Sequence, residues 1–278
     1  MANRRSRIAA AAISTATLGA WAGWFEPRRL VVRELDVWVG WWPERLNGLT
    51  IAVVADLHVG SPHVNPARVT RIVQRINDLS PDVVCLLGDY LSLDMFLGHR
   101  VAPDAACQPL GGLHAPLGVY AVLGDHDWEL DPGGIVASLT RAGITTLEDE
   151  ATTVGDSGLW VAGISRSWRA ESDGCSALDG VPSGMPTLAL AHSPDVFPSL
   201  PPAVGLTLAG HTHGGQIRIP ALTHRIIPSR YGARYLGGLY REGAKQLFVH
   251  TGVGTSRLPV RFLVPPQITL LTISTGDA

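Results

Sequence analysis

The chain has 278 residues, of which 46% are hydrophobic and 17% are charged. This composition is typical of a globular protein and argues against intrinsic disorder, and the length is enough for one large domain or two small ones. The formal net charge of -2 argues against a dedicated nucleic-acid-binding protein, so we expect no nucleic-acid partner. The three cysteines have no short spacing, which excludes a disulfide framework and a thiolate metal site.

The N-terminal segment, residues 1–29, is predicted to be a signal or a membrane anchor. Its basic start, NRRSR, precedes an uncharged stretch over residues 8–25, which is marginally long enough to span a bilayer. An uncleaved anchor, a cleaved signal peptide and a soluble helix all fit this pattern, since residues 20–22 (AWA) form a small-x-small cleavage site. We therefore expect the protein to be membrane-associated through this segment or exported, and the pattern leaves the side of the membrane open.

From about residue 30 onward, short apolar runs alternate with amphipathic segments, which is typical of an α/β domain. The predicted strands cover residues 50–55, 82–87, 118–123, 159–164, 187–191, 206–209, 246–250 and 267–273. The predicted helices cover residues 65–79 and 135–142. Residues 91–116 have the least regular pattern and are expected to form a long loop that serves as a lid. We expect residues 30–278 to form a single domain of sheets packed on each other, with helices outside.

Polar side chains of metal-ligand type follow five of the predicted strands, each at the carboxyl end of the strand. They are Asp56 and His58, Asp89, the run Asp125-His126-Asp127, His192, and the pair His211 and His213. The carboxyl ends of strands meet at one edge of an α/β sheet, so these side chains are expected to converge. Carboxylates and imidazoles without thiols suit Mn, Fe, Zn or Mg, and mixed sets of this kind often hold two metals. Each motif alone fits an ordinary turn, but five in succession indicate a metal site.

These motifs resemble the conserved blocks of the calcineurin-like metallophosphoesterases, over roughly residues 30–275. The blocks are DLH at 56–58, GD at 88–89, GDHD at 124–127, His192, and GHTHGGQ at 210–216. The last block, the N-terminal segment and the run VHTGVGTSRLPVRFLVPPQITLL are most similar to the YkuE/YaeI-like bacterial branch. The resemblance implies a four-layer α/β/β/α sandwich, which agrees with the predicted strands and helices.

The resemblance also implies a two-metal site in which each ligand has a role. The first metal would be held by Asp56, His58 and His213. The second metal would be held by Asp125, His192 and His211, with Asp89 bridging both metals. The implied cofactors are two divalent ions of Mn, Fe, Zn or Mg, with Fe(III) as an alternative in one position.

Two further residues, His126 and Asp127, have catalytic roles in this comparison. A hydroxide held by both metals would attack phosphorus in line. His126 would stabilise the transition state or protonate the leaving oxygen, and Asp127 would orient the His126 ring. The implied enzyme is a membrane-associated, metal-dependent phosphoric ester hydrolase that cleaves phosphomonoester, phosphodiester or pyrophosphate bonds. Its substrate would be a phosphorylated small molecule or a lipid-linked phosphate.

Asp125 departs from the family pattern, which has Asn in a Gly-Asn-His-Asp or Gly-Asn-His-Glu block. An Asn supplies a carbonyl oxygen and an NH₂ donor, whereas an Asp supplies a charged oxygen and no donor. With three ionised Asp ligands and a bridging hydroxide, two divalent ions leave no net charge to attract phosphate, and a trivalent ion would restore one positive charge. This departure supports one alternative, a metal-binding protein with little catalytic activity. The other alternative is a lipid-directed pyrophosphatase such as UDP-2,3-diacylglucosamine hydrolase, which requires a cytoplasmic catalytic domain.

Overall fold

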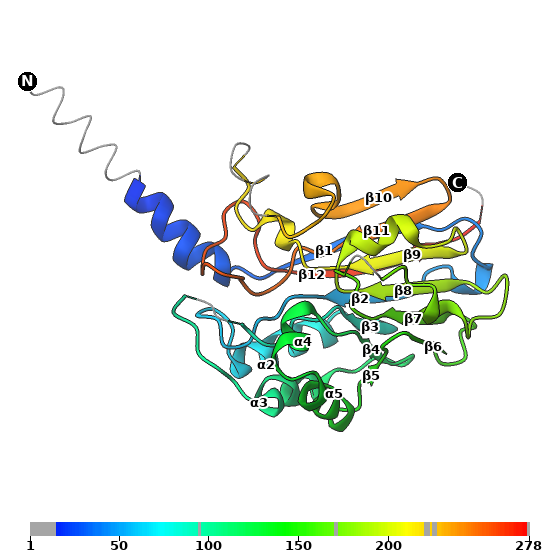
Figure 1. Cartoon of the computed structure of the whole chain (residues 1–278), viewed down its shortest axis with the longest axis horizontal. Coiled ribbons are helices and arrows are strands. Elements are labelled where there is room, and N and C mark those ends of the chain that lie inside the picture. Colours follow the sequence, from blue (N-terminus) through cyan, green and yellow to red (C-terminus); the bar gives the residue numbers. More distant parts are fainter. Residues whose placement is uncertain (1–14, 94–95, 170–171, 220–222, 224–226, 277–278) are drawn as a thin grey trace, which may run out of the picture.

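Two six-stranded β-sheets packed face to face form the frame of the molecule (Figure 1). They are seen in a computed structural model that describes residues 15–93, 96–169, 172–219, 223 and 227–276. Across the first sheet the strands are β1 (Val31–Trp38), β12 (Gln267–Ser274), β2 (Thr50–Val54), β3 (Val83–Leu86), β4 (Val119–Ala121) and β5 (Thr145–Thr146). Across the second they are β10 (Gly238–Glu242), β11 (Lys245–Val249), β9 (Val204–Ala209), β8 (Thr187–Ala191), β7 (Trp160–Ile164) and β6 (Glu150–Thr153).

Both sheets are mixed, and their central strands run parallel. In the first sheet β2, β3, β4 and β5 are parallel neighbours, and β12 pairs antiparallel with β2. In the second sheet β7, β8, β9 and β11 are parallel neighbours, and β6 and β10 pair antiparallel at the two edges. Parallel strands covered on both faces read as continuous apolar runs, which explains why these strands were predictable. All eight predicted strands are present, with ends within two residues of those expected.

The main core lies between the two sheets. Val53 of β2 and Val83 of β3 meet Leu188 of β8 and Leu206 of β9 there, and none of these side chains is exposed. Full burial of an aliphatic side chain of this size contributes about 1.5–3 kcal/mol to the stability of the fold. The sandwich therefore holds the ends of both sheets in a fixed relation to each other.

Helices cover the outer face of the first sheet. They are α2 (Pro66–Asn77), α3 (Pro103–Cys107) and α5 (Pro132–Arg141), with a 3-10 helix at Gln108–Gly112. Helix α2 begins as predicted, because the Asn65 side chain accepts a hydrogen bond from the Arg68 amide at 2.9 Å and Pro66 occupies the first turn. The irregular loop expected over residues 91–116 is wrong for its second half, since Cys107 and Leu110 are buried against the sheet.

The outer face of the second sheet is covered by 3-10 helices rather than α-helices, within the described part of the chain. They are Ser176–Leu178, Pro194–Ser199 and Gly232–Tyr235. Val196 packs against β8 and Tyr235 packs against Phe197 with ring centroids 5.8 Å apart. The α/β class and the two stacked sheets are confirmed, and the fourth layer is shorter and less regular than an α-helical one.

The described part of the N-terminal segment, from residue 15 onward, is helical and projects from the sheets (Figure 1). Residues 15–20 are helical, followed by a π-helical turn at Trp21–Phe25 and a 3-10 turn at Glu26–Arg28. Within the described ranges, no helix combines the length and apolar character that crossing a bilayer requires. The part of the predicted anchor that falls on residues 1–14 lies outside the described residues.

Candidate metal centre

The predicted site residues lie on the loops that follow the parallel strands, and the backbone turns sharply at most of them. Asp56, His58, Asp89, His211 and His213 all have positive φ, between 47° and 69°. This region is disfavoured for residues other than glycine and costs about 1–3 kcal/mol for each residue held there. Such a cost persists only where the surrounding structure imposes it, and here it aims five polar side chains at one point.

Two glycines allow these loops to approach each other closely. A Cβ atom on Gly88 would collide with the backbone nitrogen of Gly124, and a Cβ atom on Gly124 would collide with the Asp89 carboxylate. Glycine is therefore required before Asp89 and before Asp125 because the two loops pack closely, and not only because the chain turns there.

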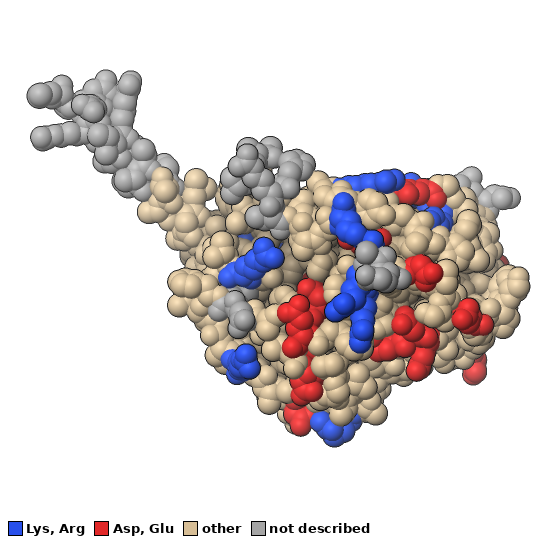
Figure 2. Space-filling model, viewed as in Figure 1, with Lys and Arg blue, Asp and Glu red and all other residues tan. Residues whose placement is uncertain are grey.

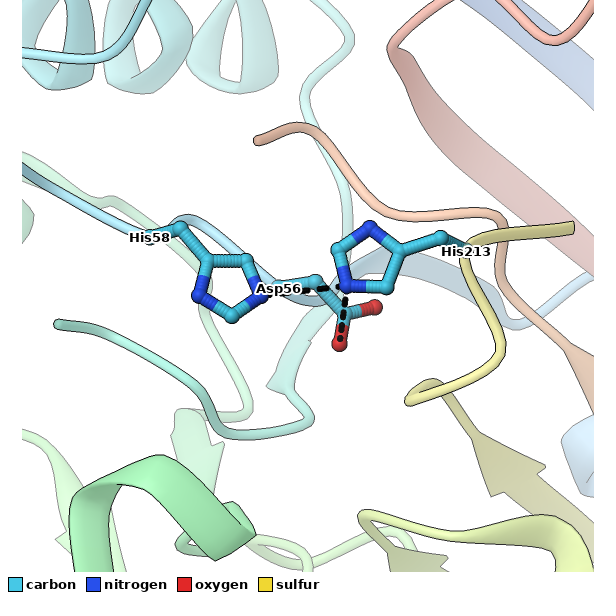
Figure 3. A group of neighbouring side chains, drawn as sticks. All are labelled: Asp56, His58 and His213. Carbon is cyan, nitrogen blue, oxygen red and sulfur yellow. Dashed lines mark hydrogen bonds and ion pairs between the residues drawn. The ribbon is translucent and has the colours of Figure 1, made fainter. Parts of the chain in front are cut away.

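One group of neighbouring side chains consists of Asp56, His58 and His213 (Figure 3). The Nε2 atoms of His58 and His213 are 3.1 Å apart, and His213 Nε2 lies 3.6 Å from Asp56 Oδ1. All three residues are buried. The side chains come from the loops after β2 and β9, so both sheets contribute to this group.

A second group consists of Asp125, His192 and His211. Asp125 Oδ1 lies 2.9 Å from His192 Nε2 and 3.1 Å from His211 Nδ1. The two ring nitrogens are themselves 3.1 Å apart. These residues follow β4, β8 and β9, so the second group also spans the two sheets.

Asp89 lies between the two groups. Its Oδ2 atom is 3.4 Å from His58 Nε2 in the first group and 3.5 Å from His192 Nε2 in the second. The same side chain accepts a hydrogen bond from the His126 amide through Oδ1 at 3.1 Å. One carboxylate oxygen thus faces both groups, as a bridging ligand does.

The nitrogen and oxygen atoms of the two groups are arranged to bind cations rather than to hydrogen-bond with each other. His192 Nδ1 donates to the Leu87 carbonyl at 2.7 Å, so the Nε2 atom of the neutral ring has a free lone pair. That lone pair points at the Asp125 carboxylate, another acceptor, so either a proton or a metal ion has to lie between the two atoms. Burial opposes protonation of His192, but the carboxylates of Asp89 and Asp125 outweigh it and raise the pKa of this ring well above its usual range.

Two histidines of the first group, His58 and His213, offer unprotonated nitrogens. Burial lowers the pKa of His58 to about 3, and burial together with the neighbouring His58 and Arg261 holds the pKa of His213 well below its usual range. Burial acts to raise the pKa of Asp89, but the positive charges of His192 and His126 hold it below its ordinary value. Neutral imidazoles beside an ionised, buried carboxylate form the donor set that divalent metals bind.

His126 and Asp127 are adjacent in sequence but face different surroundings. The His126 ring lines the open cavity of the centre, with Nδ1 3.9 Å from Asp89 Oδ2. Asp127 is fully buried, and its carboxylate accepts hydrogen bonds from the amides of Gly124, Asp89 and Tyr90 at 2.8–2.9 Å. The expected bond from Asp127 to the His126 ring is not among these contacts. Asp127 instead fixes the two loops that carry Asp89 and Asp125.

Two arginines near the centre were missed by the sequence reasoning. Arg261 is fully buried, donates to the carbonyls of Thr251, Gly254 and Val264, and lies with Nη2 3.4 Å from His213 Nδ1. Arg257 lies on the wall of the cavity. The one available signal was their position in the apolar run SRLPVRFLVPP, where a charged side chain needs a partner.

Comparison with known proteins agrees with this geometry. The model of the calcineurin-like phosphoesterase family matches residues 49–215, which is more than half of the chain. The chain belongs to the calcineurin-like phosphoesterase family. It is a metal-dependent phosphoester hydrolase by this membership, and the matched range contains every predicted site residue.

Relatives within the calcineurin-like phosphoesterases extend over most of the chain. The "Uncharacterized metallophosphoesterase YkuE" of Bacillus subtilis is 28% identical and covers 97% of this chain and 94% of its own. "Phosphodiesterase YaeI" of Escherichia coli is also 28% identical, covering 98% and 100%. A Danio rerio "Transmembrane protein with metallophosphoesterase domain" is 30% identical over 83% of this chain and 54% of its own length. The predicted similarity to the YkuE/YaeI-like branch is confirmed.

Proposed function

We propose that the chain is a phosphoesterase with a dinuclear metal centre. The observation that carries the proposal is the position of Asp89 Oδ2, which faces His58 of one three-residue group and His192 of the other at nearly equal distances. Bridging carboxylates of this kind are typical of paired metal sites that clamp a phosphoryl group. The proposed ligands of the first metal are Asp56, His58, His213 and Asp89, and those of the second are Asp125, His192, His211 and Asp89.

Two cations in these positions would supply Lewis acidity toward phosphoryl oxygens and would make water a stronger nucleophile. The chain's own residues do the rest. The His126 ring lines the cavity, and its buried Nδ1 atom makes no hydrogen bond and lies 3.9 Å from Asp89 Oδ2, so the ring is placed to donate a proton to a leaving oxygen. Arg257 on the cavity wall supplies a positive charge for an anionic substrate. Asp127 fixes the loops of Asp89 and Asp125 relative to each other through hydrogen bonds to their backbone amides.

We propose that Asp125 is a ligand of the second metal, like His192 and His211. Its Oδ1 atom lies within 3.1 Å of both His192 and His211, which is the arrangement expected of a ligand that shares a cation with them. This contact supports metal binding, which both the enzyme and the alternative of an inert metal-binding protein require, so the hydrolysis assay has to distinguish them. Three carboxylates and a bridging hydroxide against two divalent ions leave no net charge, one unit less than an Asn at this position would leave, so the attraction of the centre for phosphate is reduced.

The test is metal-dependent hydrolysis by the purified full chain. We expect activity on an aryl phosphodiester or phosphomonoester that is lost after EDTA and dialysis and restored by Mn, Fe, Zn or Mg. A panel of monoester, diester and pyrophosphate substrates then assigns the bond class, which the geometry leaves open. Activity that survives complete metal removal would contradict the proposal, as would a fully metal-loaded protein that hydrolyses none of the three classes.

A further inference from the structure

Large apolar side chains are exposed together around the base of the N-terminal helix. We define the apolar rim as Trp24, Phe25, Phe96, Leu97, Ile219, Leu258 and Leu263. Each is between 41% and 72% exposed, with Leu97 at the upper limit. Single exposed apolar residues are ordinary, but a contiguous set of this size marks a binding surface.

Backbone hydrogen bonds show that the rim is one surface although its residues come from four segments. The Phe96 amide donates to the Arg257 carbonyl at 3.3 Å, and the Arg218 amide donates to the Phe262 carbonyl at 2.9 Å. The Arg261 amide donates to the Ala22 carbonyl at 2.9 Å. The segments that carry the rim are therefore neighbours in space and lie beside the N-terminal helix.

Two leucines of the rim combine a strained backbone conformation with an exposed apolar side chain. Leu97 and Leu263 have φ of 64° and 60°, and both are more than 60% exposed. On a surface that only faces water, Asn or Gly would relieve the strain of the positive φ and remove the exposed apolar area. Leucine at both positions indicates that these side chains are covered by an apolar partner in use.

The charges around the rim identify the partner. The rim segments, residues 15–30, 96–101, 216–219 and 256–265, contain one carboxylate, Glu26, which is buried. They expose five arginines, Arg28, Arg29, Arg100, Arg218 and Arg257. The whole chain has a net charge of -2, so this end is positive on an otherwise acidic molecule, and Figure 2 shows basic side chains near the base of the helix.

We propose that the rim and the N-terminal helix dock on an anionic lipid surface. Exposed Trp and Leu side chains suit the boundary between acyl chains and head groups, and arginines beside them suit anionic head groups. Arg28 lies over the ring of Trp24, 3.5 Å from its centroid, which is a pairing suited to that boundary. A second copy of the chain fits less well, because two such faces would bring like charges together.

Docking in this way would hold the mouth of the metal centre at the lipid surface. Leu258 belongs to the rim and also lines the cavity together with Ile217 and Arg257. Substrates that reach the cavity from the rim side would then be phosphoesters attached to, or gathered at, a membrane. The inference concerns a surface outside the proposed ligand set, so its success or failure is separate from that of the metal centre.

The experiment is flotation of the full chain with vesicles of phosphatidylcholine alone or with phosphatidylglycerol added. We expect binding to the anionic vesicles that weakens as salt is raised. The double variant Leu97→Asn with Leu263→Asn should bind about tenfold more weakly, since two leucines no longer enter the interface. Its melting temperature should be equal to or above that of the parent, because Asn tolerates positive φ.

Trp41→Gln is the matched control. Trp41 is 42% exposed and follows the far end of β1, away from the N-terminal helix, so its replacement should leave vesicle binding unchanged. Equal vesicle binding by the parent and the double variant would overturn the proposal. Equal binding to neutral and anionic vesicles would also overturn it. So would self-association of the parent that the double variant abolishes without any vesicle binding.

Discussion

At the scale of single residues, His126 and Asp127 have separate roles in the structure, whereas the sequence predicted that Asp127 orients the His126 ring. The His126 ring faces the cavity, whereas the Asp127 carboxylate accepts hydrogen bonds from backbone amides of two loops. A sequence motif reports which residues are adjacent in the chain, but the direction of a buried carboxylate depends on where free amides lie in the folded structure. The metal-ligand types were therefore predictable, and the role of Asp127 was not.

His126→Ala should lower kcat by roughly 10²–10⁴ while metal content stays near that of the parent. The ring lies 3.9 Å from Asp89 and lines the cavity, so its loss removes a proton donor rather than a bridging ligand. The measurement pairs steady-state kinetics on an aryl phosphodiester with metal analysis of the same sample. Loss of metal in proportion to loss of activity would mean that His126 is a ligand.

Asp125→Asn should raise kcat/KM for an aryl phosphate or phosphodiester measured with Mn. The substitution adds one unit of positive charge to the centre and restores an NH₂ donor beside the substrate. The parent should in turn prefer iron in one position, because a charged oxygen is the harder ligand. No gain in kcat/KM, together with no preference of the parent for iron over Mn, would show that Asp125 is simply equivalent to Asn.

At the scale of elements, the centre depends on loops that approach more closely than a side chain permits. Gly124→Ala would place a methyl group against the Asp89 carboxylate, so we expect a loss of about 1–3 kcal/mol in unfolding free energy together with weaker metal binding. Gly133→Ala in α5 is the matched control, since a Cβ there meets no atom within 4 Å. That helical position should gain up to about 0.5–1 kcal/mol. Urea unfolding of both variants tests this, and equal stability of Gly124→Ala and the parent would contradict it.

Most of the strands that the sequence predicted are buried and have parallel neighbours. β8 was predicted with its exact ends because all five of its residues are buried and the four after Thr187 are apolar. β5 has two residues and β6 is half exposed, so neither produces a period that distinguishes a strand from a loop. α3 was missed because its five residues are too few to form an amphipathic repeat.

At the scale of the whole molecule, the predicted boundary after residue 29 is crossed by buried hydrogen bonds. The Glu26 carboxylate accepts from the Val264 amide at 2.6 Å, and the Pro27 carbonyl accepts from the Arg68 guanidinium at 2.9 Å. The first contact, together with the bond from the Arg261 amide to the Ala22 carbonyl, ties the base of the N-terminal helix to the loop that carries Arg261, and the second ties it to α2. A domain that begins at residue 30 keeps both sheets but lacks these partners.

A chain that begins at residue 20 should therefore be more stable than one that begins at residue 30. We expect a difference of about 1–3 kcal/mol, because the shorter chain leaves the buried Val264 amide and the Arg68 guanidinium without their acceptors. Both chains should still bind metal, since every proposed ligand lies beyond residue 55. Thermal unfolding of the two chains at equal metal loading is the measurement. Equal melting temperatures would place the boundary at residue 29 after all.

The most direct test of the account is the number of metal ions that each chain binds. The position of Asp89 between the two ligand groups predicts two ions per full-length chain by elemental mass spectrometry. Asp89→Ala should fall well below two, because both ions share that carboxylate, and His126→Ala should keep two. A parent chain that saturates at one ion, or an Asp89→Ala variant that still holds two, would contradict the dinuclear centre.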